Sequence, residues 1–206
     1  MNPPILVCTI GNKGIEVLKS SCNVYNPDIK LHIVQEEPST FGETYNKAMA
    51  ELFEEYDEII IANDDIVLTP TSVSLLMEDV NLLKSEGVKI GFVAARSDFV
   101  RTVQARTVLQ LYKSELIQAF AVSPLFAYIN KEAFKAAQFP PINYWSDDIM
   151  CMDLFQLGFH HYISRSYIHH VGSQTIGTTY SKFLTEDKPW VLENRPQYRK
   201  LLFGEY

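Results

Sequence analysis

Asn63, Asp64 and Asp65 form a polar triplet between two apolar stretches of the sequence, residues 59–62 and 66–68. Carboxylates repel a phosphate group unless a cation lies between them, and Mg²⁺ and Mn²⁺ prefer carboxylate and water oxygens. The triplet therefore indicates a divalent-metal site suited to a phosphorylated ligand. The alternative is a turn that ends a strand, because Asn and Asp are common in turns.

A second group of polar residues lies later in the chain. Asp147 and Asp148 follow Ser146, which is a suitable N-cap, and negative charge is favoured in the first turn of a helix. His169 and His170 follow an expected strand. Taken alone, the acidic pair is explained by the helix dipole, and the histidines by a strand end with one buried imidazole.

Composition narrows the class of protein. The 206 residues are 47% hydrophobic and 21% charged, which is typical of one globular domain. A net charge of −7 argues against a nucleic-acid polymer as ligand, since that binding needs Lys and Arg. The N-terminus lacks a basic leader, and no apolar run approaches the ~20 residues of a membrane span. Three cysteines without metal or redox spacing favour reduced, buried thiols, so we expect a cytoplasmic protein.

Strands and helices are expected to alternate through the first half of the chain. Apolar runs of strand length lie at 4–10, 30–34, 58–62 and 89–95, and helical apolar spacing lies at 15–22, 45–56 and 73–83. Thr69-Pro70 predicts the start of the third helix and Gly87 its end. The pattern predicts a single α/β domain, with a Rossmann-like, mostly parallel sheet flanked by helices.

Ligands of open α/β sheets bind outside the carboxyl ends of the strands. Three polar stretches follow three of the expected strands, at residues 9–12, 35–37 and 63–65. A dinucleotide fold would place a glycine-rich phosphate loop here, but the sequence has neither GxGxxG nor GxxxxGK[ST]. The acidic triplet with its cation is therefore the expected phosphate holder.

The order of the motifs along nearly the whole chain resembles family 2 glycosyltransferases of the GT-A fold. The segments that carry the resemblance are PPILVCTIGNKGIEVLKSS, HIVQEE, TYNKAMA, IANDDIVL, SPLFAYINKEAF, YWSDDIMCMDLFQLGF, YIHHVGSQT and ENRPQYRKLLFG. IANDDIVL resembles the metal-binding DxD motif, and YWSDDIMC resembles the helix whose acidic pair carries the catalytic base. The chain departs from the family in having Asn63 at the first DxD position, which puts the weight on Asp65. It also has Asp147-Asp148 in place of Glu-Asp.

The resemblance implies a role for particular residues. It implies nucleotide-sugar binding by Thr9, Gly11, Glu36, Glu37, Asn46, Asn63 and Asp64, a divalent metal (Mn²⁺ or Mg²⁺) on Asp65 with His169 or His170, and catalysis by Asp148 and Asp147. Residues 1–95 would form the nucleotide-sugar-binding half and 96–206 the acceptor-binding and catalytic half. Strand alternation puts the two histidine side chains on opposite faces, so one of them is expected to be structural.

The expected reaction moves a sugar from a nucleotide-sugar donor to an acceptor hydroxyl, on a carbohydrate or another molecule. The metal would stabilise the departing diphosphate. Asp148 would act as general base, an effect of typically ~10²–10⁴-fold, and Asp147 would orient or bind the acceptor. A single base without a covalent intermediate implies inversion at the sugar.

Two other functions remain open from the sequence. A sugar-phosphate nucleotidyltransferase would use a similar sheet, although its glycine-rich activating loop is missing. A non-catalytic carbohydrate- or nucleotide-binding module would leave the acidic edge unused. The least periodic stretch, residues 96–117, is expected to face the acceptor. Arg96, Arg101 or Arg106 would contact phosphate or acceptor there, unless the stretch is a solvated surface loop.

Overall fold

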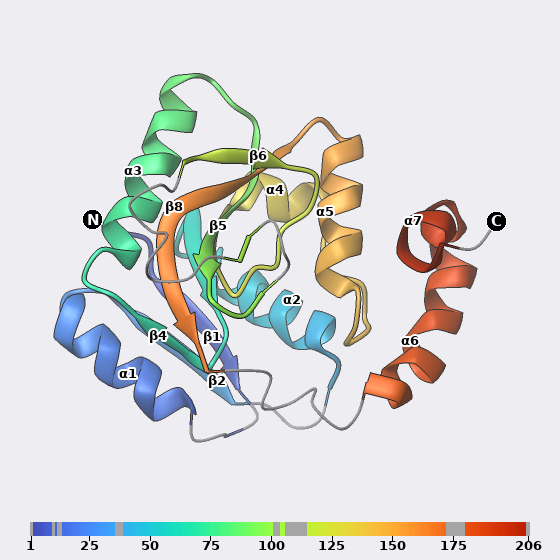
Figure 1. Cartoon of the computed structure of the whole chain (residues 1–206), viewed down its shortest axis with the longest axis horizontal. Coiled ribbons are helices and arrows are strands. Elements are labelled where there is room, and N and C mark those ends of the chain that lie inside the picture. The colour runs from blue at the N-terminus through green and yellow to red at the C-terminus, as the bar shows by residue number, and fades with distance from the viewer. Residues whose placement is uncertain are drawn as a thin grey trace.

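A computed structural model describes residues 2–9, 11, 14–35, 39–100, 104–105, 115–171 and 180–204, with only the backbone described at 180–184. Within these ranges, eight strands form one sheet in the order β2-β1-β3-β7-β5-β8-β4, and β6 pairs with β8 (Figure 1). The strands are β1 (Ile5–Thr9), β2 (Leu31–Gln35), β3 (Glu58–Ala62), β4 (Ile66–Leu68), β5 (Ile90–Ser97), β6 (Ile117–Ala119), β7 (Phe126–Asn130) and β8 (His160–His170).

The sheet is mixed, with most strands running one way. β1, β2 and β3 are parallel to one another, and β5 is parallel to β8. β7 is antiparallel to both β3 and β5, and β4 and β6 are antiparallel to β8. Five of the eight described strands therefore share a direction, which confirms the predicted α/β sheet.

Helices cover both faces of the sheet. α1 (Gly14–Tyr25) and α3 (Ser72–Ser85) lie on one face, and α2 (Phe41–Leu52), α4 (Lys131–Ala136) and α5 (Ser146–Gln156) lie on the other (Figure 1). Each layer has its own apolar cluster against the sheet, because strand side chains alternate between the two faces. Among the strand residues, Ile5 and Ile60 pack toward α1 and α3, whereas Leu6 and Ile61 pack toward α2 and α5.

Two helix starts differ from the sequence prediction. α3 begins at Ser72 with Thr71 as N-cap, so the prediction of a start at Thr69-Pro70 was wrong by two residues. The Ser72 hydroxyl accepts a hydrogen bond from the Thr69 N–H at 2.7 Å, and this bond holds a turn ahead of the helix. α5 begins at Ser146 itself, which therefore does not cap it; the N-cap is Trp145, in the left-handed region at φ 62°. The Ser146 hydroxyl donates instead to the Pro140 carbonyl at 2.8 Å.

The C-terminal segment packs beside α5. It consists of α6 (Tyr180–Asn194), a 3₁₀ turn (Pro196–Tyr198) and α7 (Arg199–Phe203), and Figure 1 shows it at one side of the molecule. A third apolar cluster joins it to α5 and to the preceding loop, through Ile142, Trp145, Ile149, Met152, Val191 and Tyr198. In the described parts of the chain, no helix is both long and apolar enough to cross a bilayer.

Candidate functional site

The polar triplet lies at the edge of the sheet where β1 and β3 end. At the end of β1, the Thr9 hydroxyl donates to Asp64 Oδ2 at 2.5 Å, and the Gly11 N–H donates to Thr9 Oγ1 at 3.0 Å. Gly11 has φ 86°, and a Cβ there would lie 2.9 Å from Gln35 Nε2 at the end of β2. A glycine therefore suits this close approach. The predicted edge residues Thr9, Gly11 and Asp64 are thus brought together.

An open pocket of about 380 Å³ adjoins these residues on the α1 side of the sheet. Thr9 and Gly11 form one wall, the α1 residues Ile15, Glu16 and Lys19 form another, and Ile33 and Gln35 of β2 complete the lining. The volume lies within the usual range for small-molecule sites. Glu36 and Glu37, which were predicted to contact the donor nearby, lie outside the described residues.

Asp65 and His170 meet although they lie 105 residues apart. The short strand β4 begins directly after the triplet and runs antiparallel to β8, with Ile66 opposite His170. This pairing brings His170 Nε2 to 3.1 Å from Asp65 Oδ2, and the Val171 N–H donates to the Asp65 carbonyl at 2.9 Å. The two side chains are only 8% and 6% exposed, for Asp65 and His170 respectively.

The hydrogen bonds of His170 identify which ring nitrogen carries a proton. Nδ1 lies 2.8 Å from the Phe99 carbonyl, which only accepts, so Nδ1 donates. In neutral His170 the lone pair of Nε2 then faces an oxygen of the Asp65 carboxylate, and two acceptors at this distance require a proton or a cation. Asp65 Oδ1 is buried and makes no hydrogen bond within the described structure. This donor set fits a divalent metal bound by carboxylate and imidazole.

The charges around Asp65 and His170 also favour a cation at this site. Burial lowers the pKa of His170, but its hydrogen bonds to Asp65 and the Phe99 carbonyl, with the charges of Asp65 and Asp98, raise that pKa above its ordinary value. The site therefore favours positive charge on the imidazole when no other cation is bound. The described residues contain no cluster of three or more metal-ligating side chains. Asp65 and His170 would accordingly leave the other coordination positions to water and to a ligand's phosphates.

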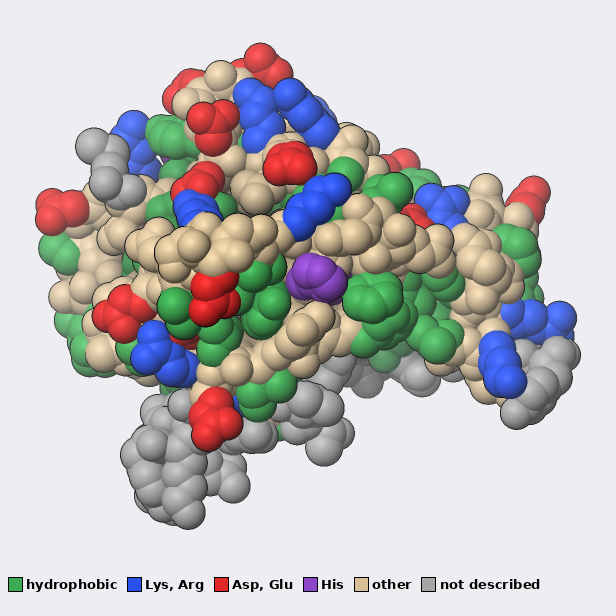
Figure 2. Space-filling model, turned by 90° about the horizontal axis from the view of Figure 1, so that it is seen from above, with side chains coloured by type: hydrophobic (Ala, Val, Ile, Leu, Met, Phe, Trp, Pro, Cys, Tyr) green, Lys and Arg blue, Asp and Glu red, His purple; other side chains and the backbone are tan. Residues whose placement is uncertain are grey.

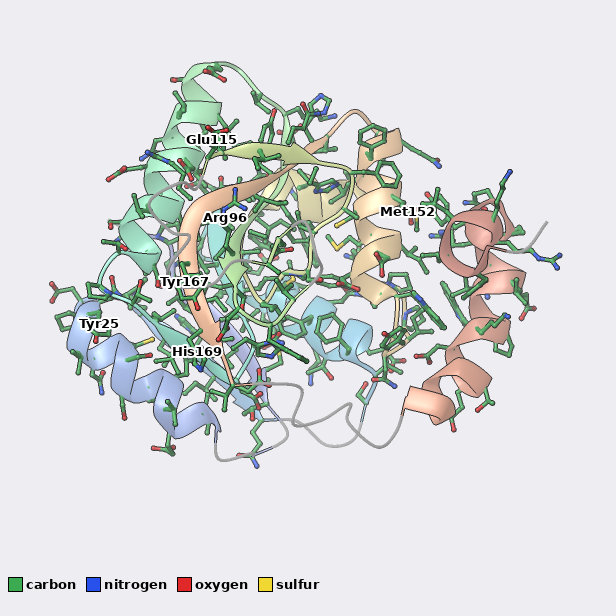
Figure 3. The ribbon with its side chains drawn as sticks, in the orientation of Figure 1. Tyr25, Arg96, Glu115, Met152, Tyr167 and His169 are labelled. Carbon is green, nitrogen blue, oxygen red and sulfur yellow. The ribbon has the colours of Figure 1, made fainter. Side chains whose placement is uncertain are left out.

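His169 is turned away from this pair, as strand alternation predicts. Its side chain is 53% exposed and forms an ion pair through Nδ1 with Oδ2 of Asp98 (Figure 3). Asp98, directly after β5, also accepts a hydrogen bond from the His170 N–H through Oδ1 at 3.0 Å. Asp98 was not predicted from the sequence. The available signal was its place after the expected strand 89–95, at the same edge as the triplet.

Asp147 and Asp148 occupy the first turn of α5, and both are partly buried. The Asp148 N–H donates to Asp147 Oδ1 at 3.0 Å, so Asp147 caps a free amide of the helix start. Figure 1 shows the N-terminal end of α5 at the edge of the sheet where β1 and β8 end. The first turn of α5 thus lies toward the same edge as the end of β8, the strand that brings His170 to Asp65.

The α2 helix connects the acidic pair to the triplet. The Gly42 N–H at its start donates to the Ile142 carbonyl at 3.2 Å, in the loop before α5. One turn later, the Tyr45 hydroxyl donates to the Ala62 carbonyl at 2.9 Å, at the end of β3. Burial keeps the pKa of Tyr45 far above its ordinary value, and the nearby Asp64 and Asp65 add to this effect. Tyr45 is therefore a neutral donor that ties α2 to the acidic edge.

Three further predicted residues are placed as follows. Asn46 bonds the backbone of Phe139 through both ends of its amide, at 2.7 and 3.0 Å. Asn63 is partly buried, and its N–H donates to the Leu125 carbonyl at 2.9 Å. Arg96 is fully buried in β5, and its Nη2 donates to the Glu115 carbonyl at 2.5 Å (Figure 3). Arg101 and Arg106 lie outside the described residues.

Solved structures of low sequence identity share this fold. A197 from STIV matches with a TM-score of 0.57 at 12% identity, over 79% of this chain and 81% of that chain. Residues 1–349 of TarS from S. aureus, in complex with UDP-GlcNAc, match with a TM-score of 0.59 at 12% identity, over 84% of this chain and 59% of that chain. The UDP complex of the same TarS fragment gives a TM-score of 0.56 at 11% identity, over 98% and 75% of the two chains.

The sequence itself adds nothing to these matches, because no protein-family model and no curated sequence matches it. At 11–12% identity the similarity concerns the fold alone. The architecture of a mixed sheet flanked by helices in one domain is nevertheless shared with GT-A glycosyltransferase structures. The chain therefore has the GT-A type of fold that its sequence predicted.

Proposed function

We propose that this protein is a metal-dependent glycosyltransferase, which moves a sugar from a nucleoside diphosphate sugar to an acceptor hydroxyl. The observation that carries the proposal is the buried Asp65–His170 pair, placed at the carboxyl edge of a GT-A sheet with an accepting Nε2 turned toward a carboxylate. The similarity to TarS bound to UDP-GlcNAc and to UDP supports a nucleotide-sugar donor.

The donor side of the site is assigned to the ends of β1 to β3. Asp65 and His170 would hold Mn²⁺ or Mg²⁺, and the metal would supply a Lewis acid for the negative charge of the departing diphosphate. Thr9 and Gly11 face the nucleotide from the wall of the adjoining pocket, and Asp64 lies beside them as the acceptor of the Thr9 hydroxyl. Glu36, Glu37, Asn46 and Asn63 keep their predicted donor roles as part of the proposal.

The acceptor side is assigned to the start of α5. Asp148 takes the proton of the acceptor hydroxyl while the hydroxyl oxygen forms a bond to the anomeric carbon of the sugar. In the same step, the bond between that carbon and the diphosphate oxygen breaks. Asp147, whose Oδ1 accepts the Asp148 N–H, orients the pair and binds the acceptor. A single displacement with one base inverts the anomeric centre.

The test is a panel of UDP- and GDP-sugars incubated with the protein in Mn²⁺, in Mg²⁺ and in EDTA. We expect metal-dependent release of nucleoside diphosphate by transfer or by slow hydrolysis, and product NMR should show an inverted anomeric configuration. Pyrophosphate release from a nucleoside triphosphate and a sugar phosphate would indicate a nucleotidyltransferase instead. Tight binding of sugar nucleotides without any turnover would indicate a binding module.

A further inference from the structure

We propose that Asp98 is the positioning residue of His170, and that His169 locks Asp98 in place. The two adjacent histidines then have different roles. His170 faces Asp65, and His169 forms an ion pair with the Asp98 carboxylate that accepts the His170 N–H. The part of this inference that concerns metal rests on the proposed function. The part that concerns the orientation of His170 rests on the geometry of the metal-free protein.

The sheet brings Asp98 to the two histidines. β5 and β8 are parallel neighbours, and Ser97 at the end of β5 pairs with Ile168, immediately before the histidine pair. Asp98 then reaches both histidines at once. Its Oδ1 accepts the N–H of His170 at 3.0 Å, and its Oδ2 pairs with Nδ1 of His169. One carboxylate thus fixes the backbone of one histidine and the side chain of the next.

The residue after Asp98 fixes the ring of His170. The Phe99 carbonyl accepts from His170 Nδ1 at 2.8 Å, and the two rings lie with centroids 5.8 Å apart. Asp98 and Phe99 therefore hold His170 by its backbone, its Nδ1–H and its ring. Such outer contacts orient a metal-binding imidazole and select which nitrogen is left to bind. Here they leave Nε2 pointing at Asp65.

Asp98 is a support and not a third ligand in this arrangement. Partial burial raises its pKa, but the His170 N–H and the charge of His169 outweigh that effect and hold the pKa of Asp98 below its ordinary value. Both carboxylate oxygens are already engaged by the histidines, and the Ser97 hydroxyl also donates to Oδ1 at 3.2 Å. An exposed ion pair such as His169–Asp98 contributes little to stability. The role assigned to this ion pair is therefore to orient the carboxylate of Asp98.

The first experiment locates the protons of the histidine rings in the metal-free protein by long-range ¹H–¹⁵N NMR at about pH 9, where imidazoles of ordinary pKa are neutral. Wild type should show a proton on Nδ1 of His170, because the Phe99 carbonyl only accepts. His161 provides an internal reference of the opposite kind, because its Nδ1 accepts from the Phe92 N–H and its Nε2 donates to the Cys151 carbonyl. Asp98→Ala should give His170 a mixture of the Nδ1–H and Nε2–H forms and leave the form of His161 unchanged.

The second experiment measures Mn²⁺ affinity without nucleotide, by the EPR signal of free Mn²⁺. Asp98→Ala should weaken binding by about 10–100-fold, the range for outer-shell partners of metal ligands. Asp98→Asn keeps an acceptor for the His170 N–H and should lose less, and His169→Gln should resemble it. Asp28→Asn, an equal charge change at an exposed position before β2, should bind Mn²⁺ as wild type does.

The outcomes separate this inference from the proposed function. If folded Asp98→Ala keeps His170 in the Nδ1–H form and binds Mn²⁺ within twofold of wild type, the inference is overturned. If Asp98→Ala does not fold, Asp98→Asn and His169→Gln decide by the same two readouts. If wild type binds no divalent metal, the proposed metal site fails, and the tautomer comparison still decides whether Asp98 positions His170.

Discussion

At the scale of single residues, the site depends on two ionisable side chains that are buried against each other. Burial of a carboxylate and an imidazole is costly unless charge and hydrogen bonds compensate. Here Asp65 has one oxygen near His170 Nε2 and one buried oxygen without a hydrogen-bond partner in the described structure. A divalent cation would satisfy both oxygens and the imidazole nitrogen together, which is why the pair carries the functional proposal.

Asp65→Ala is therefore expected to abolish most metal-dependent nucleotide binding. Calorimetry with UDP should show at least ~10-fold weaker binding in Mn²⁺ for the variant, because an anchoring carboxylate is lost. Asp57→Ala removes an exposed carboxylate just before β3 and serves as the matched control. Equal UDP affinity of wild type in EDTA and in Mn²⁺ would contradict the assignment.

Two histidines are expected to shape the pH dependence of stability in different windows. Burial lowers the pKa of His161 to about 4, so its contribution is present above the unfolded value of ~6.5 and is lost as pH falls from there toward 4. A shift of that size corresponds to roughly 3 kcal/mol. The pKa of His170 is raised, so its contribution is present below ~6.5 and is lost as pH rises through the folded value.

The contributions of His161 and His170 should accordingly make the metal-free protein most stable near pH 6.5. Its free energy of unfolding should decline at lower and at higher pH. Thermal melts in EDTA between pH 4 and pH 9 measure this profile. Mn²⁺ should stabilise the protein more as pH rises, because the metal must displace the proton of His170. His170→Gln should remove the decline above pH 6.5, and a persisting decline would mean that another group causes it.

At the scale of elements, much of the acidic edge followed from the sequence. The apolar run that became β3 was predicted at its observed bounds, and the triplet after it lies at the expected edge. The contact between Asp65 and His170 was expected only through family resemblance. It depends on β4, a strand of 3 residues, pairing with the end of β8, and local periodicity does not specify such a distant pairing.

The remaining features could not be predicted for identifiable physical reasons. Strand alternation predicted that His169 and His170 face opposite ways, but which one is buried depends on the register with β4. Asp98 lay in a stretch without periodicity, so nothing marked it as a partner of the histidines. The start of α5 was misjudged because a left-handed Trp145 begins the helix, and Trp rarely adopts that conformation.

The start of α5 carries the prediction that Asp148 is the base. Asp148→Asn is nearly isosteric and should preserve folding and donor affinity, while turnover falls by at least ~10²-fold. Asp147→Asn should act more on acceptor affinity, because acceptor binding is the role proposed for Asp147 and the Asn Oδ1 can still accept the Asp148 N–H. Initial rates at saturating donor compare the two variants. Near-normal turnover of Asp148→Asn beside an inactive Asp147→Asn would place the base one residue earlier.

The contact between α2 and the loop before α5 requires a glycine. A Cβ on Gly42 would lie 1.7 Å from the Pro140 carbonyl oxygen, so Gly42→Ala must push the two segments apart. Overpacking of this kind costs typically about 1–3 kcal/mol. Thermal melts should show the loss, while Glu51→Ala, at an exposed position of the same helix, should change little. An unchanged melting temperature for Gly42→Ala would show that the contact between Gly42 and Pro140 leaves room for a Cβ.

At the scale of the whole molecule, the polar chemistry is concentrated at one edge of the sheet. The opposite edge, seen in Figure 2, carries acidic and basic side chains interspersed over its described surface. The exposed rings of Phe120, just after β6, and Phe155, in α5, lie with their centroids 4.9 Å apart. The sheet joins the two halves inferred from the sequence. β5 begins in the first half, at Ile90, and lies between β7 and β8 of the second half.

The C-terminal segment takes part in the same organisation through Asp187 of α6. This carboxylate is 5% exposed, and its Oδ2 accepts the N–H groups of Asn143 and Tyr144 at 3.1 and 2.6 Å. Those two residues lie in the loop that leads through Trp145 into α5 and its acidic pair. Asp187 thus holds the loop that leads to the proposed acceptor side, although it lies 43 residues after Tyr144 in the chain.

Asp187→Ala is expected to damage turnover more than donor binding. Two N–H groups lose their acceptor, which costs about 1–3 kcal/mol for each that remains buried, and the loop before α5 is released. Asp65, His170 and Thr9 are held by other contacts, so UDP affinity in Mn²⁺ should stay within about threefold while donor turnover falls by roughly 10-fold or more. Glu193→Ala, at an exposed position of the same helix, is the control. Equal losses of UDP affinity and turnover would instead mean that α6 supports the fold as a whole, and that the loop before α5 does not depend on Asp187 in particular.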